Sequence, residues 1–184
     1  MMTRHQLISP AYLGEQRALH AMPRGYGGKG DKWTAAVLDL ARRFDCWSVL
    51  DYGCGQGALG RALLARTDRR LDVREYDPAI EGKNARPMFA DLVVSTDVLE
   101  HVEPDRLDAV LAHIRTLARR VVFVVIATRP SNKTLSDGRN AHLILESDAW
   151  WRARMEAAGF TVQTDPPQSP LTKPSREWVA VLRP

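Results

Sequence analysis

The sequence of 184 residues predicts an α/β fold with a doubly wound, mostly parallel sheet that ends in an antiparallel hairpin. Short apolar runs alternate with segments of helical periodicity, which indicates βαβ units and a parallel sheet. A glycine-rich stretch, DYGCGQGALG at residues 51–60, stands where a strand gives way to a helix. Near the C-terminus, two short apolar runs flank a proline-rich segment, which favours a hairpin.

The composition fits one soluble globular domain. The hydrophobic content of 45% and charged content of 26% are ordinary for this class. Two cysteines, Cys46 and Cys54, are too few for a disulfide framework, so we expect a cytoplasmic protein with reduced thiols. The net charge of +4 comes mostly from scattered arginine pairs without a basic block, so a nucleic-acid partner is not indicated. No apolar run approaches the roughly 20 residues that span a membrane, so no membrane partner is expected.

The first 30 residues differ from the rest of the chain. The stretch MPRGYGGKG at residues 22–30 is too rich in glycine for regular structure. We therefore expect a lid or flexible leader at residues 1–30 and one cofactor-binding domain at residues 31–184. A helix should begin with Asp31 as its N-cap, because apolar residues repeat at helical spacing after it: Val37, Leu38, Ala41 and Phe44.

Strands and helices then alternate. Strands are predicted at residues 47–52, 71–76, 91–96 and 121–127. Helices are predicted at residues 58–66 and 104–120, and a third should begin after Ser147 and end before Gly159. The hairpin would pair residues 160–165 with residues 177–184. Because residues 121–127 are apolar throughout, this strand should be central and covered on both faces.

Ligands bind at the carboxyl ends of the strands in such a sheet, so the residues that follow each strand are candidates. Gly53, Gly55 and Gly57 follow the first strand and allow a positive φ or close contact with a ligand. The G-x-G-x-x-G match at residues 55–60 is weak evidence for a dinucleotide by itself. Asp77 follows the second strand, where a ribose hydroxyl is usually bound, so the ligand should resemble adenosine.

Asp51 helps to separate the candidate cofactors. A carboxylate at the end of the first strand would repel a pyrophosphate and would suit a ligand that carries an ammonium group and a sulfonium. The alternative is a buried aspartate that caps the glycine loop.

Three motifs carry a resemblance to a known family. VLDYGCGQG at residues 49–57 resembles motif I of the class I S-adenosylmethionine (SAM) methyltransferases, and YDP at residues 76–78 resembles their acidic motif after the second strand. DLVVSTDVLEHV at residues 91–102 looks like the fourth-strand motif of the small-molecule branch. The resemblance covers roughly residues 31–184, is specific at superfamily level, and implies a Rossmann-like fold with SAM as cofactor. Short bacterial and phage methyltransferase-like proteins are similar.

The resemblance implies a role for each matching residue. Asp51 would lie near the methionine end of SAM, the glycine-turn backbone would wrap the cofactor, and Asp77 would bind the ribose. The implied cofactor-binding residues are Asp51, Gly53, Cys54, Gly55, Gly57, Asp77, Pro78, Asp97 and Val98. One departure is the short chain between Asp77 and Asp91. The usual second helix and third strand must be reduced to residues 79–84 and 86–90, which leaves Met88 and Phe89 as weak candidates for the adenine wall.

Methyl transfer is an in-line displacement that needs alignment, and a base can take the acceptor's proton. His101 follows the fourth-strand motif, and His142 lies in the long excursion at residues 129–147, so both are candidate bases. Either histidine could instead be structural. Glu100 with the two histidines could make a metal site, but no spacing supports one and no metal is predicted.

Three basic residues are candidates for binding charged groups. Arg129 and Arg139 would bind an anionic acceptor or remain solvated on a loop. Lys29 would reach the SAM carboxylate if residues 26–33 folded over the cofactor.

The sequence therefore predicts a SAM-dependent methyltransferase that acts on an oxygen or nitrogen atom of a small molecule. The stretch TDVLEH replaces the D/N/S-P-P-Y/F motif expected of an enzyme that methylates DNA bases at nitrogen. Two alternatives remain. One is a SAM-binding protein that is non-catalytic or depends on a partner, and the other is an NAD(P)-dependent oxidoreductase. The sequence does not indicate the acceptor or the oligomeric state.

Overall fold

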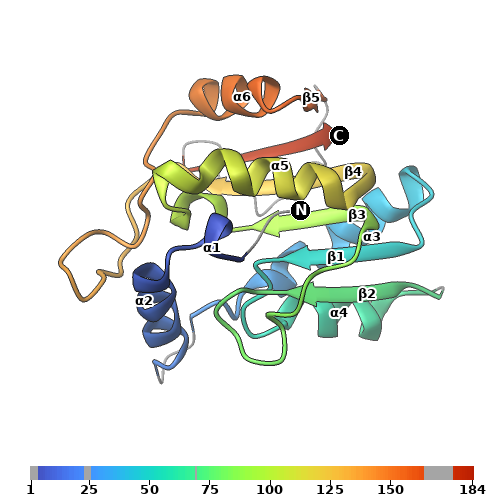
Figure 1. Cartoon of the computed structure of the whole chain (residues 1–184). Coiled ribbons are helices and arrows are strands. Elements are labelled where there is room, and N and C mark those ends of the chain that lie inside the picture. Colours follow the sequence, from blue (N-terminus) through green and yellow to red (C-terminus); the bar gives the residue numbers. More distant parts are fainter. Residues whose placement is uncertain (1–3, 23–25, 69, 164–175) are drawn as a thin grey trace.

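A computed structural model describes residues 4–22, 26–68, 70–163 and 176–184. A six-stranded sheet with the order β2-β1-β3-β4-β6-β5 forms its centre (Figure 1). The four parallel strands are β1 (Ser48–Tyr52), β2 (Asp72–Tyr76), β3 (Ala90–Thr96) and β4 (Ala118–Ala127). Strand β6 (Glu177–Arg183) runs antiparallel to β4, and β5 (Thr161–Val162) runs antiparallel to β6. The predicted mixed sheet with its C-terminal hairpin is confirmed, and the proline-rich link lies outside the described residues.

Helices cover both faces of the sheet (Figure 1). One layer contains α1 (Arg4–Leu7), α5 (Leu107–Leu117) and α6 (Asp148–Ala157), and its core includes the buried Trp151. The opposite layer contains the 3-10 turn η1 (Gly30–Trp33), α3 (Thr34–Arg43) and α4 (Ala58–Arg66), and its core includes the buried Trp33. Within the described ranges, no helix has the length and apolarity needed to cross a membrane.

Two of the three predicted later helices end where the sequence indicates, and one does not. Helix α6 begins after Ser147, whose hydroxyl accepts a hydrogen bond from the Trp150 amide, and Gly159 follows its end with a φ of +87°. Helix α5 stops at Leu117, so the predicted helix over residues 104–120 is too long. Arg119 and Arg120 instead extend β4, because β3 offers a parallel partner as far back as Ala90.

The N-terminal region contains structure that the sequence did not reveal. Helix α2 (Pro10–His20) begins after Ser9, whose hydroxyl accepts a hydrogen bond from the Tyr12 amide. Its apolar side packs against the excursion that follows β4, in a cluster with Leu135 and Ala141 (Figure 1). The expected N-cap at Asp31 is wrong, because Asp31 lies inside η1 and its backbone carbonyl accepts a hydrogen bond from the Thr34 hydroxyl.

The connection from β2 to β3 is irregular. No helix or strand forms between residues 77 and 89 in this described part of the chain, so the third strand expected at residues 86–90 is absent and only Ala90 belongs to β3. A parallel crossover needs about a dozen residues besides the strand it serves. The chain between β2 and β3 is too short to supply both a crossover and a third strand. Gly82, with a φ of +81°, lies in a turn within this stretch. Strand β2 is therefore an edge of the sheet.

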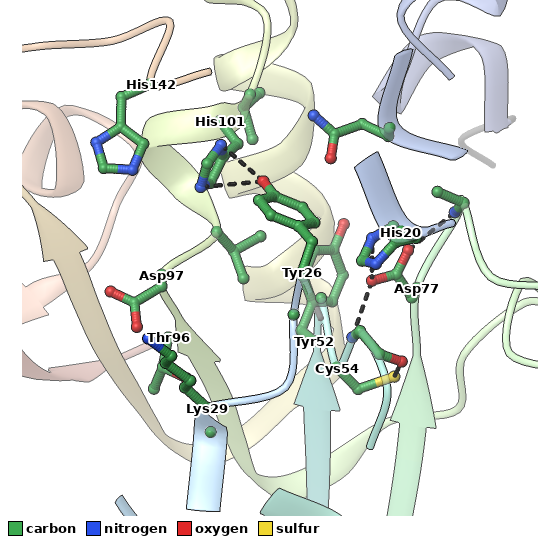
Figure 2. A pocket seen from close by; sticks show the side chains of 18 of the residues that line it. His20, Tyr26, Lys29, Tyr52, Cys54, Asp77, Thr96, Asp97, His101 and His142 are labelled. Atoms are coloured by element: carbon green, nitrogen blue, oxygen red, sulfur yellow. Dashed lines mark hydrogen bonds and ion pairs between the residues drawn. The ribbon is translucent and has the colours of Figure 1, made fainter. Parts of the chain in front are cut away.

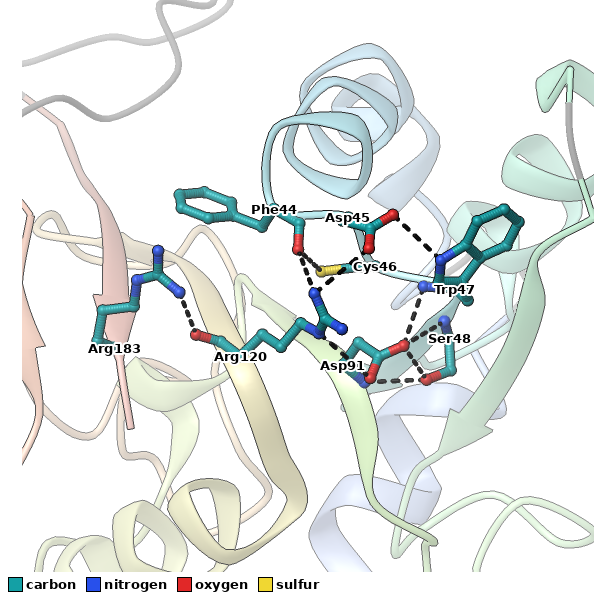
Figure 3. Close-up of polar contacts among 8 residues, drawn as sticks. All are labelled: Phe44, Asp45, Cys46, Trp47, Ser48, Asp91, Arg120 and Arg183. Carbon is teal, nitrogen blue, oxygen red and sulfur yellow. Dashed lines mark hydrogen bonds and ion pairs between the residues drawn. The ribbon is translucent and has the colours of Figure 1, made fainter.

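A polar cluster holds the amino ends of β1 and β3 together (Figure 3). One oxygen of the Asp91 carboxylate accepts hydrogen bonds from the Trp47 amide at 2.9 Å, the Ser48 amide at 3.1 Å and the Ser48 hydroxyl at 3.0 Å. The Arg120 guanidinium lies 3.9 Å from the other oxygen. These bonds and the nearby cation hold the pKa of Asp91 below its usual value, although partial desolvation acts in the other direction.

Candidate functional site

A cavity of about 630 Å³ lies at the carboxyl ends of the parallel strands, within the size range of small-molecule sites. The sequence-predicted residues that line it are Asp51, Gly53, Cys54, Gly55, Asp77, Pro78, Asp97, Val98, His101 and His142. Gly57 is not among the lining residues described and instead stands at the N-cap of α4. The fold therefore brings together nearly all of the candidates that the sequence places after separate strands.

The glycine turn needs residues without a side chain. Gly53 has a φ of +80°, and a Cβ atom there would lie 2.5 Å from the Val98 side chain. Gly55 has a φ of +49°, and a Cβ atom there would lie 2.5 Å from the carbonyl oxygen of Gly27. Residues other than glycine rarely adopt such φ values, and at these two positions their Cβ atoms would also collide with Val98 or Gly27. The sequence signal at these positions is therefore a requirement of backbone geometry.

Asp77 fixes this turn to the end of β2. Its carboxylate accepts hydrogen bonds from the Gly55 amide at 3.0 Å and from the Ala79 amide at 2.9 Å. His20 of α2 lies 3.9 Å away. Each carboxylate oxygen has two acceptor positions, so Asp77 retains the capacity to accept hydrogen bonds from a ligand in the cavity.

Asp51 lines the same cavity without such partners. It is only 4% exposed, and no group in the described ranges donates a hydrogen bond to its carboxylate. Burial, with a smaller contribution from the Glu75 carboxylate, raises the pKa of Asp51 to about 7. The Lys83 ammonium acts against this shift and lies 2.9 Å from Glu75. A positively charged group in the cavity would favour the ionised form of Asp51.

Lys32 and Glu177 are cavity residues that sequence reasoning missed. The Lys32 ammonium lies 3.2 Å from Asp97 and 3.7 Å from Glu177, on β6. Asp97 adopts a φ of +56°, which turns the chain sharply after β3. Glu177 pairs with β4 at Ala127. No local motif marks either residue, because the contacts join distant parts of the sequence.

The segment at residues 26–32 crosses the glycine turn, as Figure 2 shows for Tyr26 and Lys29. The carbonyl oxygen of Gly27 accepts a hydrogen bond from the Gln56 amide at 3.0 Å. The Tyr26 ring stands edge-on between His20 and His101, with centroid distances of 5.0 and 5.5 Å. This segment therefore forms one wall of the cavity.

The rings of His101 and His142 meet edge to face at one end of the cavity, with centroids 4.7 Å apart (Figure 2). Nδ1 of His101 lies 2.7 Å from the carbonyl oxygen of Ala141, and Nδ1 of His142 lies 2.6 Å from that of Arg129. A carbonyl oxygen only accepts, so each Nδ1 carries the proton and each Nε2 keeps a lone pair. Burial lowers the pKa of His101 to about 3 and also lowers the pKa of His142.

The two candidate arginines lie in different environments. Arg129 lines the cavity together with Asn132 and Lys133. Arg139 forms an exposed ion pair with Asp137, with Nε 2.7 Å from a carboxylate oxygen, and is absent from the described cavity lining. Met88 and Phe89 are exposed and also absent from that lining, so they do not form an adenine wall.

Comparisons with known proteins agree with this architecture. The family described as methyltransferase domain matches residues 19–165, more than half of the chain. Among solved structures, DhpI in complex with SAH has a TM-score of 0.64 and 22% identity over 96% of this chain and 98% of that one. A search of curated proteins found no match.

Two further solved structures are similar. The 1,6-didemethyltoxoflavin-N1-methyltransferase of Burkholderia thailandensis has a TM-score of 0.57 and 20% identity over 85% of this chain and 78% of that one. Magnesium protoporphyrin IX methyltransferase of Synechocystis PCC 6803 with bound SAH has a TM-score of 0.59 and 16% identity over 95% and 94%. At these identities the likeness shows the fold, which is that of the class I methyltransferases.

Proposed function

The chain belongs to the methyltransferase domain family, and from that premise we propose that it transfers the methyl group of SAM to an oxygen or nitrogen atom of a small molecule. The observation that carries this proposal is the convergence of the glycine turn, Asp77 and Asp97 on one cavity. Proteins of similar fold were solved with SAM or SAH bound, which supports SAM as the cofactor.

The cavity suits the charge distribution of SAM. Asp51 and Asp97 would face the ammonium and sulfonium groups, and Asp77 would accept hydrogen bonds from the ribose hydroxyls while it holds the turn. The backbone of Gly53, Cys54 and Gly55 would wrap the cofactor, with Pro78 beside the adenine and Val98 near the methyl group. Gly57 would contribute indirectly, by starting α4.

The transfer is a displacement at the sulfonium methyl. A lone pair of the acceptor forms the new bond to carbon, the carbon–sulfur bond breaks, and its electron pair neutralises the sulfonium to the thioether of SAH. The acceptor's proton would pass to Nε2 of His142 or His101. His142 is the stronger candidate base, because a pKa of about 3 makes His101 a weak one.

The acceptor is proposed to be small and anionic. Arg129 and Lys133 line the end of the cavity near His142 and would bind a carboxylate or a phosphate-like group. Residues 1–30 are proposed to act as a lid, since Gly27 and Tyr26 already contact the glycine turn and His101. Residues 31–184 would form the cofactor-binding domain.

A thermal shift assay with SAM, SAH and NADPH tests the cofactor. A ligand at about 100 times its Kd stabilises by roughly 2.7 kcal/mol, which raises Tm by roughly 5–10 °C for a domain of this size. We expect this rise with SAM and SAH, and its loss in Asp77→Asn but not in Asp45→Asn, which lies at the opposite edge. A rise with NADPH alone would overturn the proposal.

Transfer of radiolabelled methyl to a panel of small acids, alcohols and amines then tests catalysis. Activity should require the cavity aspartates and should be greatest with anionic acceptors. Tight SAM binding without transfer to any member of the panel would favour a non-catalytic or partner-dependent protein.

A further inference from the structure

Three metal-ligating side chains meet beside the cavity. Glu100 and His101 are adjacent in the 3-10 turn η2 (Leu99–His101), which follows β3, and His142 comes from the excursion after β4. One carboxylate oxygen and one nitrogen of each imidazole lie within 4.8 Å of one another. The sequence predicted no metal, because the spacing between Glu100 and His142 matches no local metal motif. The sheet brings them together by placing the ends of β3 and β4 side by side.

Backbone hydrogen bonds fix this arrangement. The carbonyl oxygen of Glu100 accepts hydrogen bonds from the amides of Leu143 at 2.8 Å and Ile144 at 3.1 Å. The His101 ring donates to the carbonyl of Ala141 in the same stretch. The excursion is therefore joined to η2 on both sides of His142, so the separation of the three side chains is set by the fold.

Both imidazoles are prepared as metal ligands. Each Nδ1–H is directed to a backbone carbonyl, so each Nε2 carries the lone pair, and that of His101 lies 3.2 Å from the Tyr26 hydroxyl. Histidines that bind metals almost always donate their other ring nitrogen in this way.

Glu100 is the independent sign of a missing partner. The residue is 0% exposed, and its Oε1 accepts a hydrogen bond from the Ala127 amide at 3.0 Å. Its Oε2 is buried and has no hydrogen-bond partner. A buried carboxylate oxygen without a partner is costly, and a bound cation would remove that cost.

We propose that Glu100, His101 and His142 bind a divalent transition-metal ion that keeps open coordination positions toward the cavity. Two imidazoles with one carboxylate suit zinc, cobalt, iron or manganese better than magnesium or calcium, which prefer oxygen ligands. Bond lengths of about 2.0–2.2 Å require the side chains to turn slightly inward. The Tyr26 hydroxyl, 3.2 Å from Nε2 of His101, must move aside, so metal binding displaces part of the proposed lid.

The role of the ion, but not its binding, rests on the proposed function. In a methyltransferase, the open positions would hold the acceptor's oxygen beside the SAM methyl group. The same Nε2 lone pairs cannot bind the metal and serve as bases at once. With the ion bound, the histidines would be ligands, and the acceptor's proton would leave to water.

Titration of the EDTA-treated full-length protein with Co²⁺ tests the site, because cobalt bound to nitrogen and oxygen ligands gives visible absorption bands. We expect one equivalent to bind with such bands. Glu100→Gln and His142→Ala should each weaken binding by at least about 100-fold, whereas His113→Gln, on α5 and outside the cluster, should not. Competition with Zn²⁺, followed by calorimetry, would give the affinity for zinc.

The readouts separate the two proposals. Absence of Co²⁺ binding, or binding that is equal in wild type and both cluster variants, overturns the metal site. The SAH-induced thermal shift, measured in EDTA, should persist in both variants. Its persistence would show that the variants are folded. Loss of that shift in the wild-type protein overturns the proposed cofactor while leaving the cobalt result to decide the metal site.

Discussion

Asp51 and Asp91 lie on neighbouring strands of one sheet but at opposite ends and in opposite environments. Asp91, at the start of β3, accepts hydrogen bonds from Trp47 and Ser48 and lies near Arg120 (Figure 3). Asp51, at the end of β1, is buried in the cavity wall without a hydrogen-bond donor in the described chain. The pKa of an aspartate is therefore lowered at the amino ends of the strands, for Asp91, and raised to about 7 at their carboxyl ends, for Asp51.

This contrast separates a carboxyl group that the protein itself stabilises, Asp91, from one that we propose binds the cofactor, Asp51. At the amino edge, every interaction of the carboxylate comes from the protein itself. At the carboxyl ends of the strands, Oε2 of Glu100 has no hydrogen-bond partner among the described residues. We propose that the buried acids with raised pKa values at the strand ends mark the site.

The largest expected difference is the pH dependence of stability caused by Asp51. Its folded pKa of about 7 exceeds the ordinary 3.8, so its stabilising contribution is complete below pH 3.8 and is lost as the pH rises through 7. Relative to Asp51→Asn, the wild type should lose on the order of 4 kcal/mol between these values, at about 1.4 kcal/mol per pKa unit. Urea unfolding of the ligand-free proteins across this range measures it, and parallel profiles would contradict it.

Removal of the carboxylate at the other edge should act in the opposite way. Asp91→Ala leaves two backbone amides without their acceptor, so we expect a loss of about 2–3 kcal/mol in the free energy of unfolding at pH 7. Because the pKa of Asp91 is lowered, its contribution should be lost on acidification instead. Chemical denaturation measures the loss. The SAH-induced thermal shift should be retained. A variant that folds but no longer responds to SAH would show that the Asp91 cluster also affects the ligand site.

The affinity for SAH should depend on the charge of Asp51. If the carboxylate pairs with the ligand's ammonium group, binding should strengthen by about tenfold from pH 6 to pH 8, which is about 1.4 kcal/mol, as a group with a pKa of about 7 ionises. Isothermal titration calorimetry at both pH values measures this change. Asp51→Asn should bind weakly with no such dependence, and an equally steep profile in that variant would assign the effect to another group.

The smallest effect is expected for Arg120. Its guanidinium is about half exposed and lies 3.6 Å from Asp45 and 3.9 Å from Asp91. Exposed ion pairs contribute little, so Arg120→Ala should cost about 0.5 kcal/mol, and the cost should decrease as salt is added. Unfolding at low and high ionic strength checks this. A loss comparable to that of Asp91→Ala would mean that the cation, rather than the backbone hydrogen bonds, holds the amino edge together.

The sequence predicted those elements whose signals are local. Helix α4 matches its predicted range, and α6 has its predicted hydroxyl cap at Ser147. The failures have non-local causes. Arg119 and Arg120 are strand residues because β3 lies beside them, and α2 is stabilised by packing on a segment more than a hundred residues away. A single sequence does not contain those contacts in readable form.

The candidate site divides in the same way. The glycine turn, Asp77 and Asp97 were found because they follow strands. Lys32 and Glu177 were missed because their meeting depends on how β6 is placed beside β4. Glu100 and the two histidines were noticed by residue type, yet their distances depend on the backbone bonds between η2 and the excursion.

The missing third strand also affects how the molecule avoids aggregation. It leaves β2 as a bare edge of the sheet, and an unpaired edge is a template on which another chain can add a strand. Strand β2 is only five residues long and carries Asp72, Arg74 and Glu75. The Arg74 side chain also hydrogen-bonds to the carbonyl of Phe89 in the loop that follows. Charge and brevity thus protect the edge that the shortened connection exposes.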